Sequence, residues 1–374
     1  MAAATIPLFN PFSNPLFTGC VAPIVRRMRV LVTGACGFVG ACLARELSVS
    51  SPGIEVWGLD NFLREGSRAN LPNLKSLGVK MVEGDIRRPA DLAKIPKVDW
   101  VIDCAAEPSV LAGTSGKMSS MDLLDHNLIG TIQMLEFCKQ HSAGFILMST
   151  SRVYSIPPLT SLPVEAVQGA FRPKSFRPEI GLTEKGISEI FPTTPPASLY
   201  GTSKRCSELL ALEYAEAFGF PVWINRCGVL AGAGQFGRTD QGIFSFWIRS
   251  WREKKPLKYI GFDGRGSQVR DCLHPRDLLP LLQKQLQGHR PSDPKDGIDL
   301  RICNFSGGTK NSISLAQLSD WCRARFGPHD IGSDPHPRPY DLPWVVLDSS
   351  RATQLWNWHP KTSLKPIFSE ISDG

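Results

Sequence analysis

Between residues 29 and 150, short apolar runs alternate with longer segments of mixed polarity. Continuous apolar runs of this length are typical of strands in a parallel sheet that is covered on both faces. The pattern predicts strands at 29–33, 55–59, 80–82, 100–103 and 144–149, and helices at 37–47 and 128–140. Strands separated by helices indicate βαβ units, so we expect an α/β fold built on a parallel sheet.

The pattern changes in the second half of the chain. Residues 156–196 are rich in proline and lack apolar periodicity, which indicates a functional or mobile loop. A helix at 200–219 and a strand at 221–225 follow, and then irregular loops with short helices at 275–287 and 314–326. We therefore expect a first domain at 28–225, with loop 156–196 over the active site, and a smaller C-terminal lobe at 226–374 that returns some segments to the sheet.

Composition and charge exclude several classes of protein. With 42% hydrophobic and 21% charged residues, the chain is typical of a globular protein. A net charge of +7 without clustered Lys and Arg favours an anionic small molecule and argues against nucleic acid as partner. No apolar run approaches the roughly 18 residues that span a bilayer, so we expect no membrane association.

The ten cysteines include no C-x-x-C pair, and most lie in apolar segments. This usage indicates buried free thiols in a reducing cytoplasm and no metal site. Residues 1–27 lack acidic residues and precede Met28. We interpret them as a disordered extension or as an over-long start before Met28, with a transit peptide as the open alternative.

A glycine motif follows the first predicted strand and opens the first predicted helix. The segment 33–40 reads TGACGFVG, with Gly34, Gly37 and Gly40 spaced three residues apart. Glycines permit a tight turn and a close approach of the backbone, so that the helix N-terminus can bind a pyrophosphate. The setting predicts a Rossmann-type, doubly wound sheet that binds a dinucleotide.

A carboxylate follows the second predicted strand. Asp60 lies 20 residues beyond Gly40 and can accept hydrogen bonds from ribose hydroxyls. It would repel a 2′-phosphate, so NAD is favoured over NADP. Arg64 lies close to Asp60 in sequence and could bind a 2′-phosphate, so NADP stays open as the alternative cofactor.

Tyr200 and Lys204 are four residues apart on one face of a predicted helix. A lysine and a bound nicotinamide both favour the phenolate form of a tyrosine, which lowers its pKa. Tyr200 could then take a proton from a sugar hydroxyl while hydride leaves the same carbon. Thr150, at the end of the fifth predicted strand, is the candidate second partner of that hydroxyl.

At these residues the chain resembles the extended short-chain dehydrogenase/reductase family, in particular its nucleotide-sugar epimerases and dehydratases. The resemblance runs from Met28 to about Pro360. It implies that Thr150, Tyr200 and Lys204 are catalytic. The residues that it assigns to NAD are Gly34, Gly37, Phe38, Val39, Gly40, Asp60, Asn61, Arg64, Asp85, Ile86, Ala105, Ala106, Asn127, Tyr200 and Lys204.

Two features narrow the reaction within this family. The 4,6-dehydratases carry an Asp-Glu pair after the strand-end threonine, where this chain has Ser151-Arg152. Segments 234–236, 240–242 and 266–274 resemble the CDP-paratose 2-epimerases, which implies transient oxidation at C2 of a CDP-3,6-dideoxyhexose. The residues implied to bind the nucleotide sugar are Glu107, Arg226, Gln235, Gln241 and Arg270, the last on the diphosphate.

Two alternatives stay open at this point. A UDP-sugar 4-epimerase of the same fold is the enzymatic one, and a non-catalytic NAD-binding regulatory or RNA-associated protein is the one from another class. An intact Thr150, Tyr200 and Lys204 argue against the latter, because binding alone does not need them. The resemblance also implies a homodimer or homotetramer that packs through the helices at 128–140 and 202–219.

Overall fold

The computed structural model describes residues 27–374 apart from 115–117, 239–240 and 294. Its centre is a seven-stranded sheet in which every paired neighbour is parallel. Across the sheet the order is β13 (Ile302–Phe305), β10 (Val222–Cys227), β5 (Gly144–Thr150), β4 (Trp100–Asp103), β1 (Met28–Thr33), β2 (Ile54–Asp60) and β3 (Lys80–Glu83). Since the order reverses at β1, a crevice opens at the carboxyl ends of β1 and β4.

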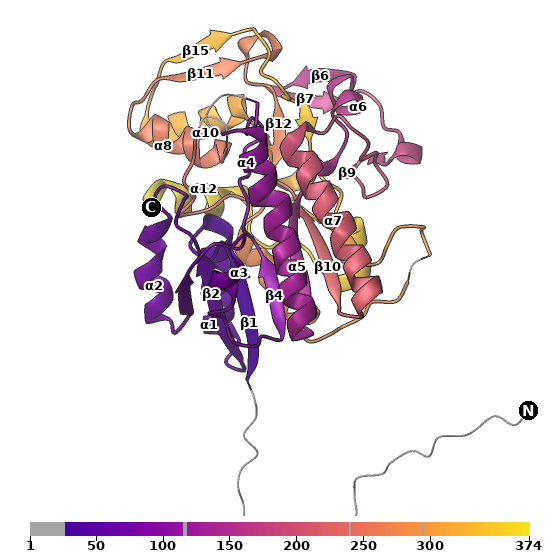
Figure 1. Ribbon diagram of the computed structural model, residues 1–374. Helices are drawn as coiled ribbons and strands as arrows, with labels where there is room; N and C mark the ends of the chain where they lie inside the picture. The colour runs from indigo at the N-terminus through magenta and orange to yellow at the C-terminus, as the bar shows by residue number, and fades with distance from the viewer. Residues whose placement is uncertain (1–26, 115–117, 239–240, 294) are drawn as a thin grey trace, which may run out of the picture.

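Helices cover both faces of the sheet, as the apolar strands require (Figure 1). One face packs against α1 (Phe38–Ser50), α2 (Leu71–Ser76), α9 (Leu279–Leu286) and α11 (Ser350–Trp356). The other packs against α5 (Gly130–His141) and α7 (Ser198–Phe218). These two layers confirm the predicted Rossmann-type α/β fold. Two shorter helices also belong to this part of the chain. α3 (Pro89–Leu92) is a single turn, and α4 (Ser120–Leu124) continues through a π-helical turn into α5.

The predicted elements agree closely with the observed ones. Five predicted strands correspond to β1 to β5, and the strand predicted at 221–225 is β10. The predicted helix at 314–326 is α10 (Leu315–Phe326), which Ser314 caps by accepting a hydrogen bond from the Gln317 N–H at 3.1 Å. Some segments of 226–374 were expected to return to the sheet, but the sequence did not indicate which; β13 joins it next to β10.

The smaller lobe covers the carboxyl ends of the strands (Figure 1). Its helices α8 (Ile243–Arg252), α10 and α12 (Leu364–Asp373) share one hydrophobic cluster. Its strands form two small sheets, β11 (Leu257–Ile260) with β15 (Ile331–Asp334), and β14 (Ser312–Ser314) with β12 (Val269–Asp271) and β16 (Trp344–Val345). No helix among the described residues is long and apolar enough to cross a membrane.

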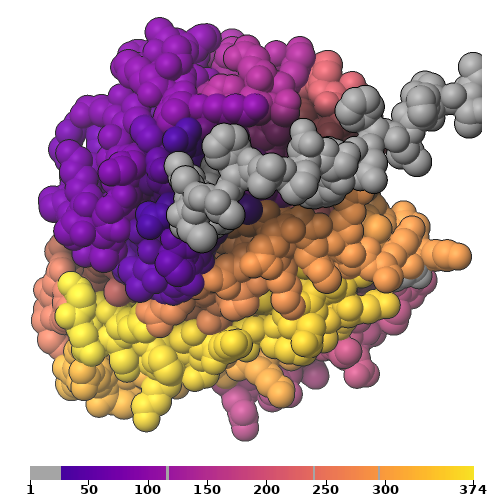
Figure 2. All heavy atoms as spheres, turned by 90° about the horizontal axis from the view of Figure 1, so that it is seen from below, coloured from indigo at the N-terminus to yellow at the C-terminus, as the bar shows by residue number. Residues whose placement is uncertain are grey.

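Segments from the C-terminal part of the chain also return to the first domain. Seen from below, orange and yellow residues form the surface beside the indigo and violet N-terminal ones (Figure 2). Ala352, Leu355 and Trp356 of α11 belong to the same core cluster as β1 and α1. The domains are therefore not contiguous in sequence. Residues 1–26 of the expected extension at 1–27 lie outside the described residues.

The structure corrects the interpretation of residues 156–196 as a loop over the active site. The segment has its own structure, with α6 (Ile156–Thr160) and two hairpins, β6 (Val164–Val167) with β7 (Ala170–Pro173) and β8 (Leu182–Thr183) with β9 (Gly186–Ile187). Its apolar side chains form a cluster with residues 342–347. None of its residues lines the central cavity. Its prolines break periodicity without preventing a packed core.

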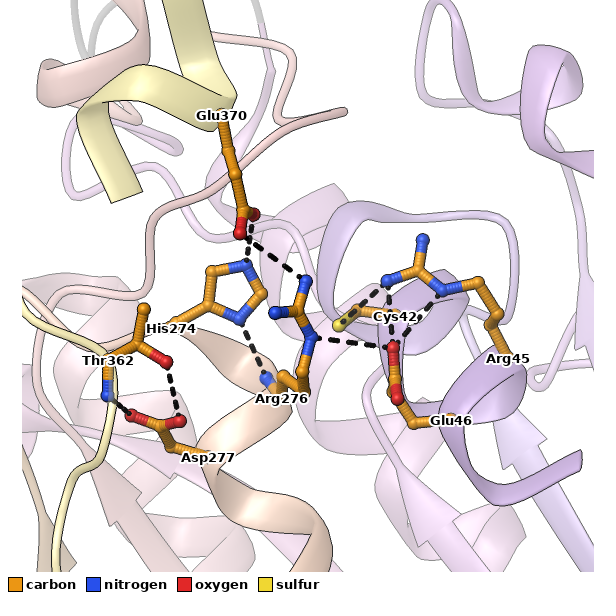
Figure 3. Close-up of polar contacts among 8 residues, drawn as sticks. All are labelled: Cys42, Arg45, Glu46, His274, Arg276, Asp277, Thr362 and Glu370. Carbon is orange, nitrogen blue, oxygen red and sulfur yellow. Dashed lines mark hydrogen bonds and ion pairs between the residues drawn. The ribbon is translucent and has the colours of Figure 1, made fainter. Parts of the chain in front are cut away.

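A polar cluster around the buried His274 fastens α12 to α1, the helix that follows the glycine motif (Figure 3). His274 Nδ1 accepts a hydrogen bond from the Arg276 N–H at 3.0 Å, so Nε2 carries the ring proton and donates it to Glu370 at 3.1 Å. Arg276 pairs with Glu46 of α1 at 3.6 Å and with Glu370 at 3.5 Å. Burial lowers the pKa of His274, which keeps the ring neutral for this arrangement. His274 thus caps the helical turn that begins at Pro275 and links this turn to Glu370 of α12.

Candidate active site

A cavity of about 580 Å³ lies between the sheet and the lobe. Residues that directly follow β1, β2, β3, β4, β5 and β10 line it on the sheet side. From the lobe come Gln235, Gln241, Gln268 and Arg270, together with residues 338–341. Since parallel strands end at one edge, chain segments far apart in sequence meet here, as expected for a doubly wound sheet.

The glycine motif forms a cradle with no room for side chains. A Cβ atom at Gly40 would lie 2.1 Å from the Gly34 carbonyl oxygen, and Gly34 itself has a φ of +59°. Gly37 begins α1 without a capping side chain, which leaves the first N–H groups of the helix, at Phe38 and Val39, for a ligand. All five residues line the cavity. The N-terminus of α1 thus has free N–H groups and no side chains that would keep a ligand away, which fits the pyrophosphate of a dinucleotide.

Replacing Gly40 by Ala tests the cradle directly. The added methyl group overlaps the Gly34 carbonyl, and overpacking of this kind costs about 1–3 kcal/mol. We expect Gly40→Ala to weaken the retention of NAD about tenfold or more, measured as cofactor released from purified protein. Gly53→Ala is the matched control, since nothing lies within 4 Å of its added Cβ. Equal NAD content in the two variants would contradict this role of the cradle.

Asp60 ends β2 at the floor of the cavity. Its carboxylate accepts hydrogen bonds from the N–H groups of Cys36 and Phe62, both at 2.8 Å. Burial raises the pKa of Asp60 and these bonds lower it, with a net increase. Each oxygen keeps a lone pair for a further donor. Asn61 and Arg64 also line the cavity, and Arg64 donates to the Phe236 carbonyl at 3.1 Å.

Three of the residues that the resemblance assigns to the cofactor, Asp85, Asn127 and Lys204, lie behind the cavity wall. Asp85 contributes no surface to the cavity, and Arg87 and Asn61 bind its carboxylate at 2.7 and 3.1 Å; its neighbour Ile86 does line the cavity. Asn127 is 1% exposed and holds the backbone of Glu107 through bonds of 2.8 and 3.0 Å. Asn127 therefore positions the segment 105–107, whose three residues line the cavity.

Tyr200 and Thr150 come together at the end of β5. The Thr150 hydroxyl acts on the phenol and lowers its pKa, and both residues line the cavity. Burial raises the pKa of Tyr200 to about 12, while Thr150 and the charge of Arg152 lower it and Cys227 and Glu107 raise it. The phenol and the hydroxyl can bind the same substrate oxygen, and deprotonation of the phenol is the step that the site must favour.

Lys204 is in a different environment from the one that the sequence suggested. It lies on α7 one turn beyond Tyr200, 2% exposed, and does not line the cavity. Burial lowers its pKa, and the carboxylates of Asp103 and Glu208 raise it. These carboxylates offset the ammonium charge. Arg152, rather than Lys204, is the cation with the largest effect on the pKa of Tyr200.

The residues expected to bind the nucleotide sugar divide into two groups. Glu107, Gln235, Gln241 and Arg270 line the cavity. Arg226 does not: it is 2% exposed, and its guanidinium binds Glu208 at 2.7 and 3.0 Å. The prediction that Arg226 contacts the substrate is therefore wrong, because its side chain points from β10 into the protein, where it pairs with Glu208 of α7.

Unsatisfied polar atoms mark the lobe side of the cavity. The side-chain oxygens of Gln241 and Gln268 are buried without a hydrogen-bond partner. Gln268 directly precedes β12 and lies two residues before Arg270, and both line the cavity. Because side chains two residues apart in extended chain share a face, this spacing could have revealed Gln268 from sequence. Arg270 pairs with Asp341 at 3.0 Å. Asp341, Arg338 and Tyr340 line the cavity from a turn that the sequence analysis did not assign to the site.

Comparison with known proteins agrees with this geometry. Residues 30–296 match the family described as NAD dependent epimerase/dehydratase. CDP-paratose 2-epimerase of Salmonella typhi is 29% identical, covering 92% of this chain and 98% of that protein. UDP-glucose 4-epimerase of Mycoplasma pneumoniae is 25% identical, with 92% and 95% covered. The structure of UDP-glucuronic acid 4-epimerase of Bacillus cereus with UDP-glucuronic acid and NAD has a TM-score of 0.72 at 25% identity, with 92% and 98% covered.

The chain belongs to the NAD dependent epimerase/dehydratase family, since the match covers more than half of its length. The resemblance stated from the motifs is confirmed, and with it the expectation of NAD as cofactor. The epimerases among the relatives agree with the expectation of an isomerase. The cradle at Gly34–Gly40 and the carboxylate of Asp60 are the parts of this chain that fit NAD.

Proposed function

We propose that the protein is an NAD-dependent epimerase of nucleotide-diphosphate sugars, which oxidises one carbon of the sugar to a ketone and reduces it again on the opposite face. The observation that carries the proposal is that the Tyr200 phenol and Thr150 line the same cavity as the glycine cradle, with Thr150 acting on the phenol. A protein that only bound NAD would need the cradle but not this pair.

The proton transfers and the orientation of the sugar oxygen can be assigned to residues of the cavity. Bound NAD supplies an acceptor for the hydride and returns it. Tyr200, as phenolate, takes the hydroxyl proton and later gives it back to the re-formed alkoxide, so that protons and electrons balance over the cycle. Thr150 orients the sugar oxygen toward the phenol. Epimerisation needs no further acid–base pair, and Ser151-Arg152 follow Thr150 where a dehydratase of the family carries two carboxylates.

For the substrate we propose a CDP-3,6-dideoxyhexose that reacts at C2, as in the CDP-paratose and CDP-tyvelose pair. The similarity to the Salmonella typhi enzyme along almost the whole chain supports this choice. Arg270 would bind the diphosphate, and the unpaired oxygen of Gln241 would accept a donor from the nucleotide or sugar. The second candidate is a UDP-sugar 4-epimerase, which the Mycoplasma and Bacillus relatives favour.

Substrate turnover distinguishes these candidates. Purified protein is first assayed for released NAD and is then incubated with CDP-paratose, CDP-tyvelose and UDP-hexoses while proton NMR spectra are recorded. We expect the two CDP sugars to interconvert and the UDP-hexoses to stay unchanged. Interconversion of a UDP-hexose at C4, without turnover of either CDP sugar, would refute the assignment to C2.

We also propose a homodimer or homotetramer in the cytoplasm. Large apolar side chains are exposed beside the helices expected to pack between subunits: Ile129 before α5, and Leu209 and Phe218 on α7, at 41%, 47% and 47%. Burial of such a surface would favour association. For the location, the support is that the nine described cysteines are free thiols.

A further inference from the structure

The backbone of Arg152 is fixed between the two elements that carry Thr150 and Tyr200. Its N–H donates to the Thr150 hydroxyl oxygen at 3.2 Å. A Cβ atom at Gly201 would lie 2.1 Å from the Arg152 carbonyl oxygen, so this backbone lies directly against the first turn of α7, next to Tyr200. Arg152 therefore enters the cavity at the site where the proton is transferred.

The side chain of Arg152 reaches across the cavity. One guanidinium nitrogen donates to the Tyr340 carbonyl at 3.3 Å, on the opposite wall. Arg270 and Asp341 are the other charged groups that act on it, and Asp341 is already bound to Arg270 at 3.0 Å. Among the described residues, no carboxylate oxygen lies within 4.0 Å of Arg152. Its positive charge is therefore not neutralised by an ion pair of its own.

The other cation near the phenol is placed differently. Lys204 lies behind the cavity wall, where the charges of Asp103 and Glu208 act on it. Opposite charges buried together offset each other at short range. A phenolate that forms in the cavity therefore shares it with the guanidinium of Arg152, while the ammonium of Lys204 is offset by two carboxylates.

We propose that Arg152 is a positioning residue of the catalytic site, whose guanidinium lies in the same cavity as the Tyr200 phenol and stabilises the phenolate that takes up the proton of the sugar hydroxyl. This role in catalysis rests on the proposed function, whereas the electrostatic interaction does not. The charges around the phenol agree with it: Arg152 lowers the pKa of Tyr200, against burial, Cys227 and Glu107. Burial and the charge of Arg270 lower the pKa of Arg152, but a guanidinium stays protonated in proteins, so Arg152 keeps its charge while Tyr200 titrates.

Titration of Tyr200 tests the interaction without any substrate. Phenolate absorbance is recorded against pH in each NAD-loaded protein. The curve of the same protein with Tyr200→Phe added is then subtracted, which leaves the titration of Tyr200 alone. Loss of a neighbouring positive charge disfavours the phenolate, so Arg152→Met should raise the midpoint by about one pH unit or more. Arg152→Lys should titrate near the wild type. Arg172→Met, at an exposed arginine of β7 outside the cavity, is the matched control.

The pH profile of turnover provides the second readout. Tyr200 must be deprotonated to act, so Arg152→Met should move the acid limb of kcat/KM to higher pH by the same amount as the absorbance midpoint. Below that limb, kcat/KM should fall about tenfold for each pH unit by which the limb moves. At higher pH the rate of the variant should approach that of the wild type. If Arg152→Met does not fold with bound NAD, Arg152→Gln takes its place.

Two results would overturn the proposal. One is a Tyr200 midpoint in the neutral variant equal to that of the wild type. The other is a loss of activity by the same factor at every pH, which a merely structural role would produce. If none of the nucleotide sugars is turned over, the proposed function fails, but the absorbance titration still decides whether Arg152 acts on Tyr200.

Discussion

Replacing Tyr200 by Phe is expected to abolish most of the turnover while the protein keeps its fold and its NAD. The substitution removes only the phenolic oxygen, which acts in the cavity together with the Thr150 hydroxyl. Without it, no group remains in place to take the proton of the sugar hydroxyl as hydride leaves. General acid–base groups contribute about 10²–10⁴-fold, so we expect a loss on the order of 10³-fold in kcat.

A second tyrosine provides the control for this experiment. Tyr259 donates to Ser319 at 2.7 Å within the lobe and does not line the cavity. Tyr259→Phe should therefore keep activity within a few-fold of the wild type. Activity of Tyr200→Phe equal to that of Tyr259→Phe would remove Tyr200 from the mechanism, whereas a loss of NAD would indicate a structural role.

Replacing Glu208 by Leu is expected to destabilise the fold strongly. Glu208 is 0% exposed and accepts hydrogen bonds from Ser149 at 2.6 Å, Arg205 at 2.9 Å and Arg226 at 2.7 and 3.0 Å. Although burial alone would raise its pKa, these partners lower it, so it is a carboxylate. Removing it leaves the buried guanidinium of Arg226 unpaired, a change that costs about 3–5 kcal/mol. Urea unfolding monitored by circular dichroism measures the loss.

A double variant distinguishes the loss of the Glu208–Arg226 ion pair from a general effect of substitution in α7. Glu208→Leu combined with Arg226→Met removes both buried charges, and this should recover a large part of the lost stability. Glu213→Leu, at an exposed position of the same helix, should change the free energy of unfolding by less than about 0.5 kcal/mol. A loss below about 1 kcal/mol in Glu208→Leu alone would contradict the role of this ion pair.

The parts of the site that sequence predicted are those fixed by local chemistry. The strand, the glycine motif and the helix that follows are continuous in sequence, and the overlap at Gly40 shows why no other residue fits there. Tyr200 and Lys204 share a helix face because their spacing requires it. The carboxyl ends of parallel strands meet at one edge, so Asp60 and Thr150 could also be assigned to the cavity.

The parts that could not be predicted depend on tertiary contacts. The residue type of Arg226 suited an anionic substrate, but its burial against Glu208 of another element has no local signal. The charge of the Lys204 ammonium is offset by the carboxylate of Asp103, which lies far away in the sequence. In the sequence, Arg152 stands out only as the replacement of a dehydratase carboxylate. Its place beside Tyr200 depends on how η3 (Ser151–Val153) packs on α7.

The fate of one hydrogen atom tests the central claim most directly. CDP-paratose carrying deuterium at C2 is incubated with the NAD-loaded protein in ordinary water, and the product is examined by NMR and mass spectrometry. Transient oxidation predicts CDP-tyvelose that keeps the deuterium on the inverted carbon, because the same hydride returns to the opposite face. Epimerised product in which hydrogen from water has replaced the deuterium would contradict the account, since it would require inversion by removal and return of a proton.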